Sequence, residues 1–391
     1  MATSATTFPD SQHFERARTA ESASAPWSIY AVLFASTSVI LGVIWDISWH
    51  RSIGRDTFWT PAHLGIYLGG VVAGLTSGWV ALRTTFAGSD ADRGKAVRFW
   101  GFRAPLGAWV CIWGAFAMVT SAPFDDWWHN AYGLDVKIIS PPHMLLAAGI
   151  AAIQYGAMLM TLAWQNRAIG DRGHLGRLYL LAAGLLLLLV ATVATEHTQR
   201  WDMHRSHLYQ VSAGVFLFFI ISAARASVSR WPATTIAAVY TGLTLFMLVL
   251  MPLFPAQPLL GPIYVQVDHF MPTDFPLLLI VAAFALDLLL QRARGRVNDW
   301  TLALLASAVF LVAFVAVQWP FADFLMTPAA RNWFFVSHRM PYSADPAFQA
   351  RWYQLNPSEG LTAGWLMALV IGFVSARCGL WWGNWMSRVQ R

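Results

Sequence analysis

Residues 45–63 read WDISWHRSIGRDTFWTPAH, and residues 124–143 read FDDWWHNAYGLDVKIISPPH. Both stretches place an aspartate four residues before a histidine, and both end on a second histidine that directly follows proline or lies one residue beyond it. The two spacings are Asp46-x3-His50-x12-His63 and Asp125-x3-His129-x13-His143. Each stretch also joins two apolar runs. The sequence therefore predicts an internal repeat of two helical hairpins, each with an acid–histidine–histidine trio at its turn.

The composition of the whole chain is that of a membrane protein. The chain is 57% hydrophobic and 12% charged, with a mean hydropathy of +0.49. These values are typical of polytopic α-helical membrane proteins and exclude an ordinary soluble domain. About ten runs are long enough, or nearly so, to cross ~30 Å of hydrocarbon. They are 27–45, 64–82, 103–122, 143–164, 178–195, 208–224, 233–254, 275–290, 300–319 and 361–382. We expect an all-α integral membrane bundle.

The distribution of basic residues predicts the topology. Most of the 26 lysines and arginines fall on one side when both termini are cytoplasmic, which is the orientation that the positive-inside rule favours. The helices then form five outward-opening hairpins, and we expect a bacterial inner-membrane location. The net charge of +6 is mostly this topology signal. No basic surface interleaved with aromatic residues suggests a nucleic-acid partner.

Three regions follow from this topology. Residues 1–26 are polar and are expected to form a disordered cytoplasmic tail. Residues 27–165 hold the duplicated hairpins with the metal-binding trios. Residues 166–391 form an additional transmembrane bundle, whose long outer loop 320–360 is expected to fold as a cap or a docking surface.

Histidines gather on the predicted outer face. Nine of the eleven lie there: His50, His63, His129, His143, His197, His204, His207, His269 and His338. Positive-inside sorting alone would deplete lysine and arginine outside without enriching histidine. We therefore expect a functional site near the outer membrane face.

The two trios have the residue types of a metal site. Asp46 and His50 are one helical turn apart and project from one face, and the hairpin brings His63 back beside them. Asp125, His129 and His143 repeat this arrangement. Two imidazoles and one carboxylate leave coordination positions open on copper, iron or zinc. The alternative is that these pairs only form hydrogen bonds that pin the ends of the hairpins. The two cysteines lie in apolar runs, so a metal here would have nitrogen and oxygen ligands.

Six further residues are weaker candidates. Asp56 and Asp135 are placed to orient ligand histidines through hydrogen bonds, or they are solvated loop acids. A third set, predicted either as another site, as extra ligands or as a satisfied polar loop, consists of Glu196, His197, His204 and His207.

The paired motifs resemble those of the C subunit of the copper membrane monooxygenases, the family of particulate methane monooxygenase and ammonia monooxygenase. The resemblance covers the first third of the chain. By position, Asp46, His50 and His63 match the ligands of one copper site of that family. Asp125, His129 and His143 match the second, with aspartate where the family usually has asparagine. The resemblance implies dioxygen activation at copper, hydroxylation of a small inert substrate and a need for partner subunits.

Three classes of function remain open. The leading hypothesis is a copper-dependent membrane oxidoreductase, a monooxygenase or a relative of one, that takes a small or hydrophobic substrate from the lipid bilayer. A zinc-dependent membrane hydrolase would use the same ligand set. A non-enzymatic metal-binding or transport protein is the third, although the span interiors carry few of the polar residues that a transport path needs. Both homo-oligomers and partner subunits are compatible with the sequence.

Overall fold

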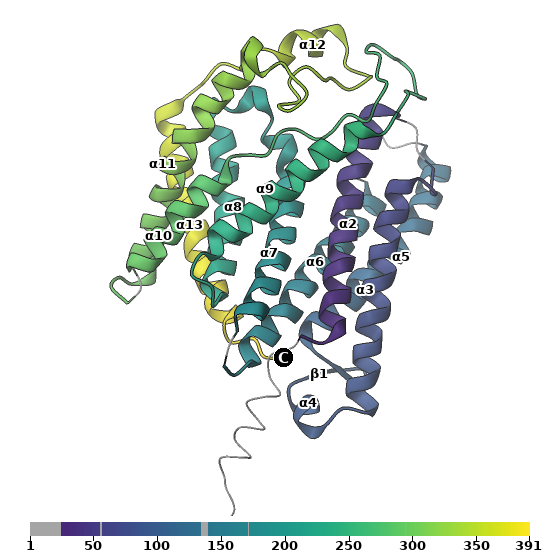
Figure 1. The fold of residues 1–391 in the computed structure, drawn as a ribbon, viewed down its shortest axis with the longest axis vertical. Coiled ribbons are helices and arrows are strands. Elements are labelled where there is room, and N and C mark those ends of the chain that lie inside the picture. Colours follow the sequence, from purple (N-terminus) through teal and green to yellow (C-terminus); the bar gives the residue numbers. More distant parts are fainter. Residues whose placement is uncertain (1–24, 55–56, 134–139, 171, 294) are drawn as a thin grey trace, which may run out of the picture.

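The computed structural model describes residues 25–54, 57–133, 140–170, 172–293 and 295–391. In these residues the chain is an all-α bundle, as expected, and it also contains one small β-hairpin that was not predicted (Figure 1). The predicted tail lies outside the described residues except for its last two positions. The long helices are α2 (Trp27–Ser52), α3 (Pro61–Phe86), α5 (Leu106–Tyr132), α6 (Pro141–Arg167), α7 (Gly173–Ala194), α8 (Ser206–Ala226), α9 (Pro232–Leu250), α10 (Leu279–Ala293), α11 (Asp299–Met326) and α13 (Leu361–Met386).

The remaining elements are short and lie in the connections between these helices. They are α4 (Asp90–Gly94), α12 (Pro346–Trp352), the single turns η1 (Thr195–His197), η2 (Arg200–Asp202), η3 (Met251–Leu253) and η4 (Pro328–Ala330), and the antiparallel strands β1 (Val97–Phe99) and β2 (Phe102–Ala104).

Nine of the described helices are long and apolar enough to cross a membrane. The tenth expected span, 275–290, is helical only from Leu279 to Ala293, which is 15 residues. A span needs about 20 residues, so α10 is too short to cross by itself. Before α10, the extended chain enters the bundle, and side chains accept hydrogen bonds from its backbone N–H groups. The Leu277 N–H donates to Tyr240 Oη at 2.9 Å, and the Leu278 N–H donates to Gln318 Oε1 at 2.9 Å. Extended backbone is tolerated in the bundle because these groups replace water.

The helices form two groups on either side of α7 and α9 (Figure 1). One group holds α2, α3, α5 and α6, and the other holds α8, α10, α11 and α13. Helix α2 packs along α3, and α5 packs along α6. In the second group α8 packs mainly on α13, which is far away in the sequence, and only slightly on its sequence neighbour α7. The start of α2 and the C-terminus lie at the same end of the bundle (Figure 1).

Glycines allow the two helices of the second hairpin to touch. A Cβ atom placed on Gly149 of α6 would lie 2.8 Å from the carbonyl oxygen of Gly114 in α5, and the reverse is also true. Small residues at such crossings let backbones approach closely, which is a common way for helices to associate in membranes. In the first hairpin, a Cβ atom placed on Gly69 of α3 would likewise lie too close to Ala35 and Val39 of α2.

A buried polar contact joins the two hairpins. The Gln154 Nε2 atom of α6 donates to the carbonyl oxygen of Ser36 in α2 at 2.7 Å, and the Ser36 hydroxyl donates back to the Gln154 side chain. Both side chains are fully buried. This reciprocal pair satisfies polar groups that would otherwise be exposed to hydrocarbon.

At the end of the bundle opposite the start of α2, residues 254–278 and 327–360 form a structured layer, here called the end cap (Figure 1). Helix α11 continues to Met326, so the expected loop 320–360 begins later than predicted and contains η4 and α12. The end cap is bonded to the end of α2. The Leu259 N–H donates to the Ile53 carbonyl at 2.8 Å, and the Tyr342 N–H donates to the Arg51 carbonyl at 3.2 Å.

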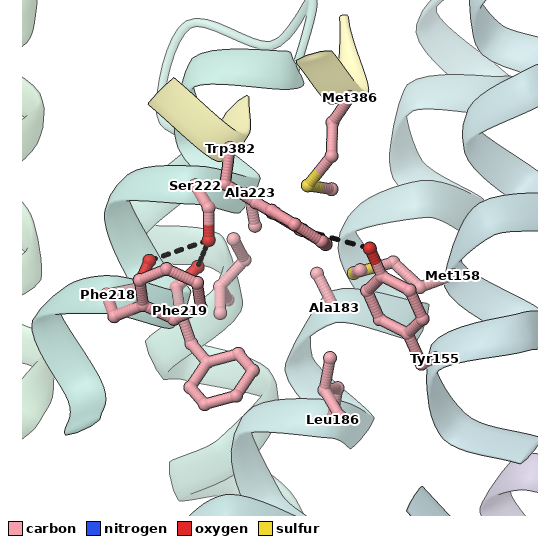
Figure 2. Close-up of a pocket in the computed structure, with 11 residues that line it drawn as sticks. Tyr155, Met158, Ala183, Leu186, Phe218, Phe219, Ser222, Ala223, Trp382 and Met386 are labelled. Carbon is pink, nitrogen blue, oxygen red and sulfur yellow. Dashed lines mark hydrogen bonds between the residues drawn. The ribbon is translucent and has the colours of Figure 1, made fainter. Parts of the chain in front are cut away.

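An apolar cavity of about 190 Å³ lies among α6, α7, α8, α9 and α13 (Figure 2). Trp382 Nε1 donates to Tyr155 Oη at 3.0 Å beside it, and the sulfurs of Met158 and Met386 flank it. Tyr155 lies twelve residues after His143 on α6, which is about 18 Å along a helix. The cavity is therefore remote from the acid–histidine trios.

Candidate metal centre

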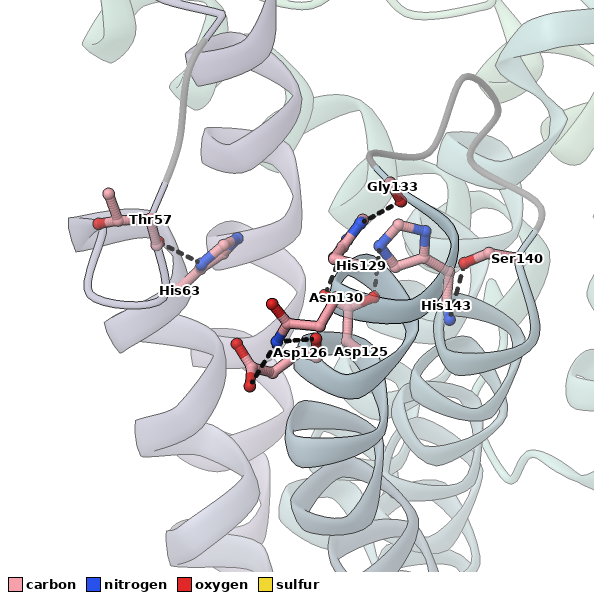
Figure 3. Close-up of polar contacts among 9 residues, drawn as sticks. All are labelled: Thr57, His63, Asp125, Asp126, His129, Asn130, Gly133, Ser140 and His143. Carbon is pink, nitrogen blue, oxygen red and sulfur yellow. Dashed lines mark hydrogen bonds and ion pairs between the residues drawn. The ribbon is translucent and has the colours of Figure 1, made fainter.

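The second trio converges at one end of the α5–α6 hairpin (Figure 3). Asp125 and His129 face the same way from the last turns of α5, and His143 lies in the first turn of α6. His129 Nε2 lies 3.3 Å from Asp125 Oδ2, and His143 Nε2 lies 3.5 Å from Asp125 Oδ1. One aspartate thus contacts two histidines from two helices.

All three side chains of this trio can offer a ligand atom to one point. These ligand atoms all lie within 4.8 Å of one another, and the trio is the single group of three or more His, Cys, Asp or Glu that meets this distance among the described residues. The side chains are between 27% and 34% exposed. A small molecule therefore has access to the trio from solvent.

The orientation of the His129 ring bears directly on metal binding. Its Nδ1 atom lies 3.2 Å from the Gly133 carbonyl oxygen (Figure 3). A carbonyl only accepts hydrogen bonds, so Nδ1 carries the proton. In a neutral ring the Nε2 lone pair then faces the Asp125 carboxylate. A metal ion between these two electron-rich atoms would remove their repulsion. Metal-bound histidines commonly hold their second nitrogen against a carbonyl in this way.

The first trio has related contacts. Asp46 Oδ1 lies 3.2 Å from His63 Nε2, and Asp46 Oδ2 lies 3.8 Å from His50 Nε2. His63 Nδ1 lies 3.1 Å from the Thr57 carbonyl oxygen. A backbone carbonyl therefore also fixes the orientation of this ring. Here His50 is more exposed, at 48%, than either histidine of the second trio. The first trio is therefore the looser of the two.

One carboxylate oxygen in each trio is buried without a hydrogen-bond donor. Asp46 Oδ1 and Asp125 Oδ1 are both inaccessible to water and accept no hydrogen bond from the described residues. Each lies against the Nε2 atom of the histidine from the following helix. A buried carboxylate oxygen without a donor is costly, and a bound cation would remove that cost. The residues present therefore fit a metal ion.

The start of the second helix in each hairpin is capped alike. Thr60 Oγ1 accepts from the His63 N–H at 3.2 Å, and Ser140 Oγ accepts from the His143 N–H at 3.5 Å. Ser and Thr are strong N-caps, and proline suits the first helical position. The Thr-Pro and Ser-Pro-Pro sequences thus place each last histidine in the first turn, facing back to the preceding helix.

The neighbours of the second trio include one more acid. Asp126 is exposed, and Asn130 Nδ2 donates to its carbonyl oxygen at 2.8 Å (Figure 3). Trp128 and Tyr132 form a close aromatic pair beside them, with ring centroids 4.5 Å apart. Asp126 has no counterpart in the first trio, where Ile47 follows Asp46.

The third predicted set separates into two parts. The rings of His197 and His207 are 5.6 Å apart and exposed. His204 instead stacks on Trp319 of α11 at 4.2 Å, and its Nε2 lies 3.3 Å from Asp323 Oδ1. Glu196 is exposed on η1. In the described residues these four side chains do not gather around one point. Asp56 and Asp135, the predicted orienting acids, lie outside the described residues.

Sequence reasoning missed the groups that orient the rings. They are the backbone carbonyls of Thr57 and Gly133, which carry no side-chain signal. Gly133 has φ +85°, a conformation that favours glycine, and Gly54, just after α2, has φ +86°. This repeated glycine was the one clue that a sequence could offer to the turn that aims a carbonyl at His129.

The chain matches no family model, and it shows no significant similarity to the curated proteins or solved structures with which it was compared. The resemblance to copper monooxygenases therefore depends on the two motifs alone.

Proposed function

We propose that this protein is a membrane-embedded metalloenzyme, a copper-dependent oxidoreductase of monooxygenase type, with its metal centre at Asp125, His129 and His143. The trio Asp46, His50 and His63 is proposed as a second, related metal site. Copper is the proposed ion because the ligands are nitrogen and oxygen and because the motifs resemble those of copper monooxygenases.

The observation that supports the proposal is the direction of the donor atoms in the second trio. His129 Nε2 and His143 Nε2 both face the Asp125 carboxylate, and the three ligand atoms lie within 4.8 Å of one another. The His129 ring cannot turn away easily, because the Gly133 carbonyl holds Nδ1. The site is thus organised before any ion binds, which lowers the cost of binding.

Each residue of the second trio would have a separate role in metal binding. Asp125 supplies negative charge, and the two imidazoles supply neutral nitrogen ligands, so the protein contributes three ligands and leaves positions for small molecules. Copper, when bound, would supply the activation of dioxygen. The solvent-accessible side of the trio admits dioxygen. The apolar surfaces of α5 and α6 would let a small hydrophobic substrate approach from the lipid.

A zinc-dependent hydrolase is the second candidate, because two histidines, one carboxylate and a water-accessible position also describe catalytic zinc sites. The nature of the bound metal separates the two. Elemental analysis of protein isolated from native membranes without added metal should find copper for the oxidoreductase and zinc for the hydrolase.

The experiment combines metal content with activity. Wild-type protein and the variants His129→Ala, His143→Ala and His50→Ala are purified in nanodiscs, loaded with copper and dialysed. We expect His129→Ala and His143→Ala to lose about one equivalent of copper each, together with oxygen-dependent hydroxylation and the Cu(II) spectrum of the second site. His174→Ala is the matched control, since His174 contacts Tyr30 at 2.7 Å near the start of α2, at the opposite end of the bundle. Full copper content in His129→Ala would refute the proposal.

A further inference from the structure

A second polar cluster lies under the end cap, and its centre is a buried arginine. Arg200 of η2 has a side chain that is only 3% exposed. Its Nη2 atom donates to Asp274 Oδ1 at 2.9 Å, and its guanidinium lies over the Trp352 ring at 4.4 Å. A guanidinium in this position is held rigidly, because a carboxylate fixes one edge and an indole covers one face.

A second arginine faces the other oxygen of the same carboxylate. Arg51, in the last turn of α2, places Nη2 3.7 Å from Asp274 Oδ2. Burial raises the pKa of Asp274, but the charges of Arg51 and Arg200 together outweigh this effect and hold that pKa below its ordinary value of 3.8. The carboxylate is therefore ionised at neutral pH. Two guanidinium groups flank one aspartate.

The charges and hydrogen bonds of this cluster do not balance. Two cations share one anion, so the cluster keeps a net positive charge. Arg51 Nη1 and Arg200 Nη1 are both buried, and neither has a hydrogen-bond partner in the part of the chain that the structure describes. Asp202, the acid closest to Arg200 in the sequence, accepts instead from Asn356 at 2.7 Å and contacts Arg205. Buried donors of charged groups are normally satisfied.

We propose that Arg51 and Arg200 form a binding site for a small oxyanion, such as a phosphate or carboxylate group. Planar guanidinium groups with unused N–H donors are the groups that proteins use to bind the oxygens of such a ligand. The side chains of Arg51 and Asp274 are about one-fifth exposed, whereas that of Arg200 is only 3% exposed. The anion therefore enters on the Arg51 side and ends against Arg200. This site does not depend on the metal centre proposed above.

The oxyanion could come from solution or from the headgroup of an anionic lipid, and the experiment separates these sources. Wild-type protein in phosphatidylcholine nanodiscs is dialysed against ³²P-phosphate at constant ionic strength, with chloride as the balancing anion. We expect saturable binding of about one phosphate per chain and a matching rise in thermal stability. Nanodiscs that contain phosphatidylglycerol should weaken phosphate binding if a lipid headgroup is the natural occupant, and should leave it unchanged if the anion is free.

Substitutions at Arg51 and Arg205 test where phosphate binds. Arg51→Gln should weaken phosphate binding at least tenfold. Arg205→Gln is the matched control, because Arg205 lies nearby at 42% exposure and already contacts Asp202 and Glu359. It should bind phosphate like the wild type. If Arg51→Gln does not yield a monodisperse protein, Arg51→Lys is tested instead. This variant keeps the positive charge but loses the planar guanidinium group, so it should weaken phosphate binding several-fold. Absence of saturable binding in the wild type, or equal binding in wild type and an Arg51 variant, would overturn the proposal.

Discussion

His129 Nε2 lies 3.3 Å from Asp125 Oδ2, one helical turn earlier on α5. Helix geometry alone brings this pair together, since residues four apart share a face. The third member comes from another helix: His143 reaches Asp125 only because α6 packs directly against α5. The candidate metal centre therefore depends on the distance between these two helices.

That distance can be tested through the glycine contact. A Cβ on Gly149 would lie 2.8 Å from the Gly114 carbonyl oxygen, so Gly149→Ala must push α6 away from α5. We expect a loss of about 1–3 kcal/mol in stability, as for overpacking, and weaker copper retention because His143 moves from Asp125. Gly78→Ala is the control, since its Cβ would meet nothing within 4 Å. Copper retention is measured by elemental analysis, and wild-type retention in Gly149→Ala would contradict the prediction.

The orienting role of the Gly133 carbonyl can be separated from backbone strain. Gly133 has φ +85° and Gly101, in the β1–β2 turn at the other end, has φ +86°, and neither has a neighbour that a Cβ would meet. Each alanine variant should cost about 1–3 kcal/mol of strain. Only Gly133→Ala should also lower copper affinity, by roughly tenfold to a hundredfold, because the His129 ring loses its fixed partner. Competition with a copper chelator measures this affinity. Equal affinities in the two variants would argue against an orienting role.

The link between the hairpins should be measurable as stability. Gln154→Ala removes a buried hydrogen bond to Ser36, and buried bonds between membrane helices contribute about 0.6–1.7 kcal/mol. We expect a loss of this size in unfolding by denaturing detergent. Gln291→Ala removes an exposed bond to the Arg230 carbonyl and should have little effect. If both variants unfold alike, the hairpins are held together by apolar packing alone.

The charge of Asp274 predicts a dependence of stability on pH. Because Arg51 and Arg200 hold its pKa below 3.8 in the folded protein, Asp274 stabilises the fold above that pH, and the contribution is lost as pH falls through the lowered pKa. Asp274→Asn should cost about 3 kcal/mol at neutral pH, as expected for breaking a buried ion pair. The difference between wild type and variant should shrink below pH 3.8. Thermal unfolding at a series of pH values measures it.

The exposed Asp90 provides the control for this series. It contacts Arg93 at 3.8 Å but is fully accessible, so solvent screens the pair. Asp90→Asn should unfold like the wild type at every pH. A constant difference between wild type and Asp274→Asn across the whole range would show that the ion pair is not the cause of the loss.

Much of the fold could be predicted from local sequence. The long apolar runs predict the membrane-spanning helices, because each of them must satisfy its own backbone in hydrocarbon. The segment 275–290 was the exception. Its hydrophobicity resembles that of a span, but Tyr240 and Gln318, which are distant in sequence, satisfy Leu277 and Leu278 in an extended form. No local pattern contains that information.

The sequence by itself determined which residues stand at the hairpin turns, because the spacing of Asp125 and His129, the proline and the N-capping serine act within one or two helical turns. Only the tertiary structure decided what these residues contact. It placed three ligand atoms of the second trio together, paired His204 with Asp323, and set Arg51 and Arg200 on either side of Asp274. Such contacts join segments far apart in the chain, and close packing of helices, rather than local preference, sets their distances.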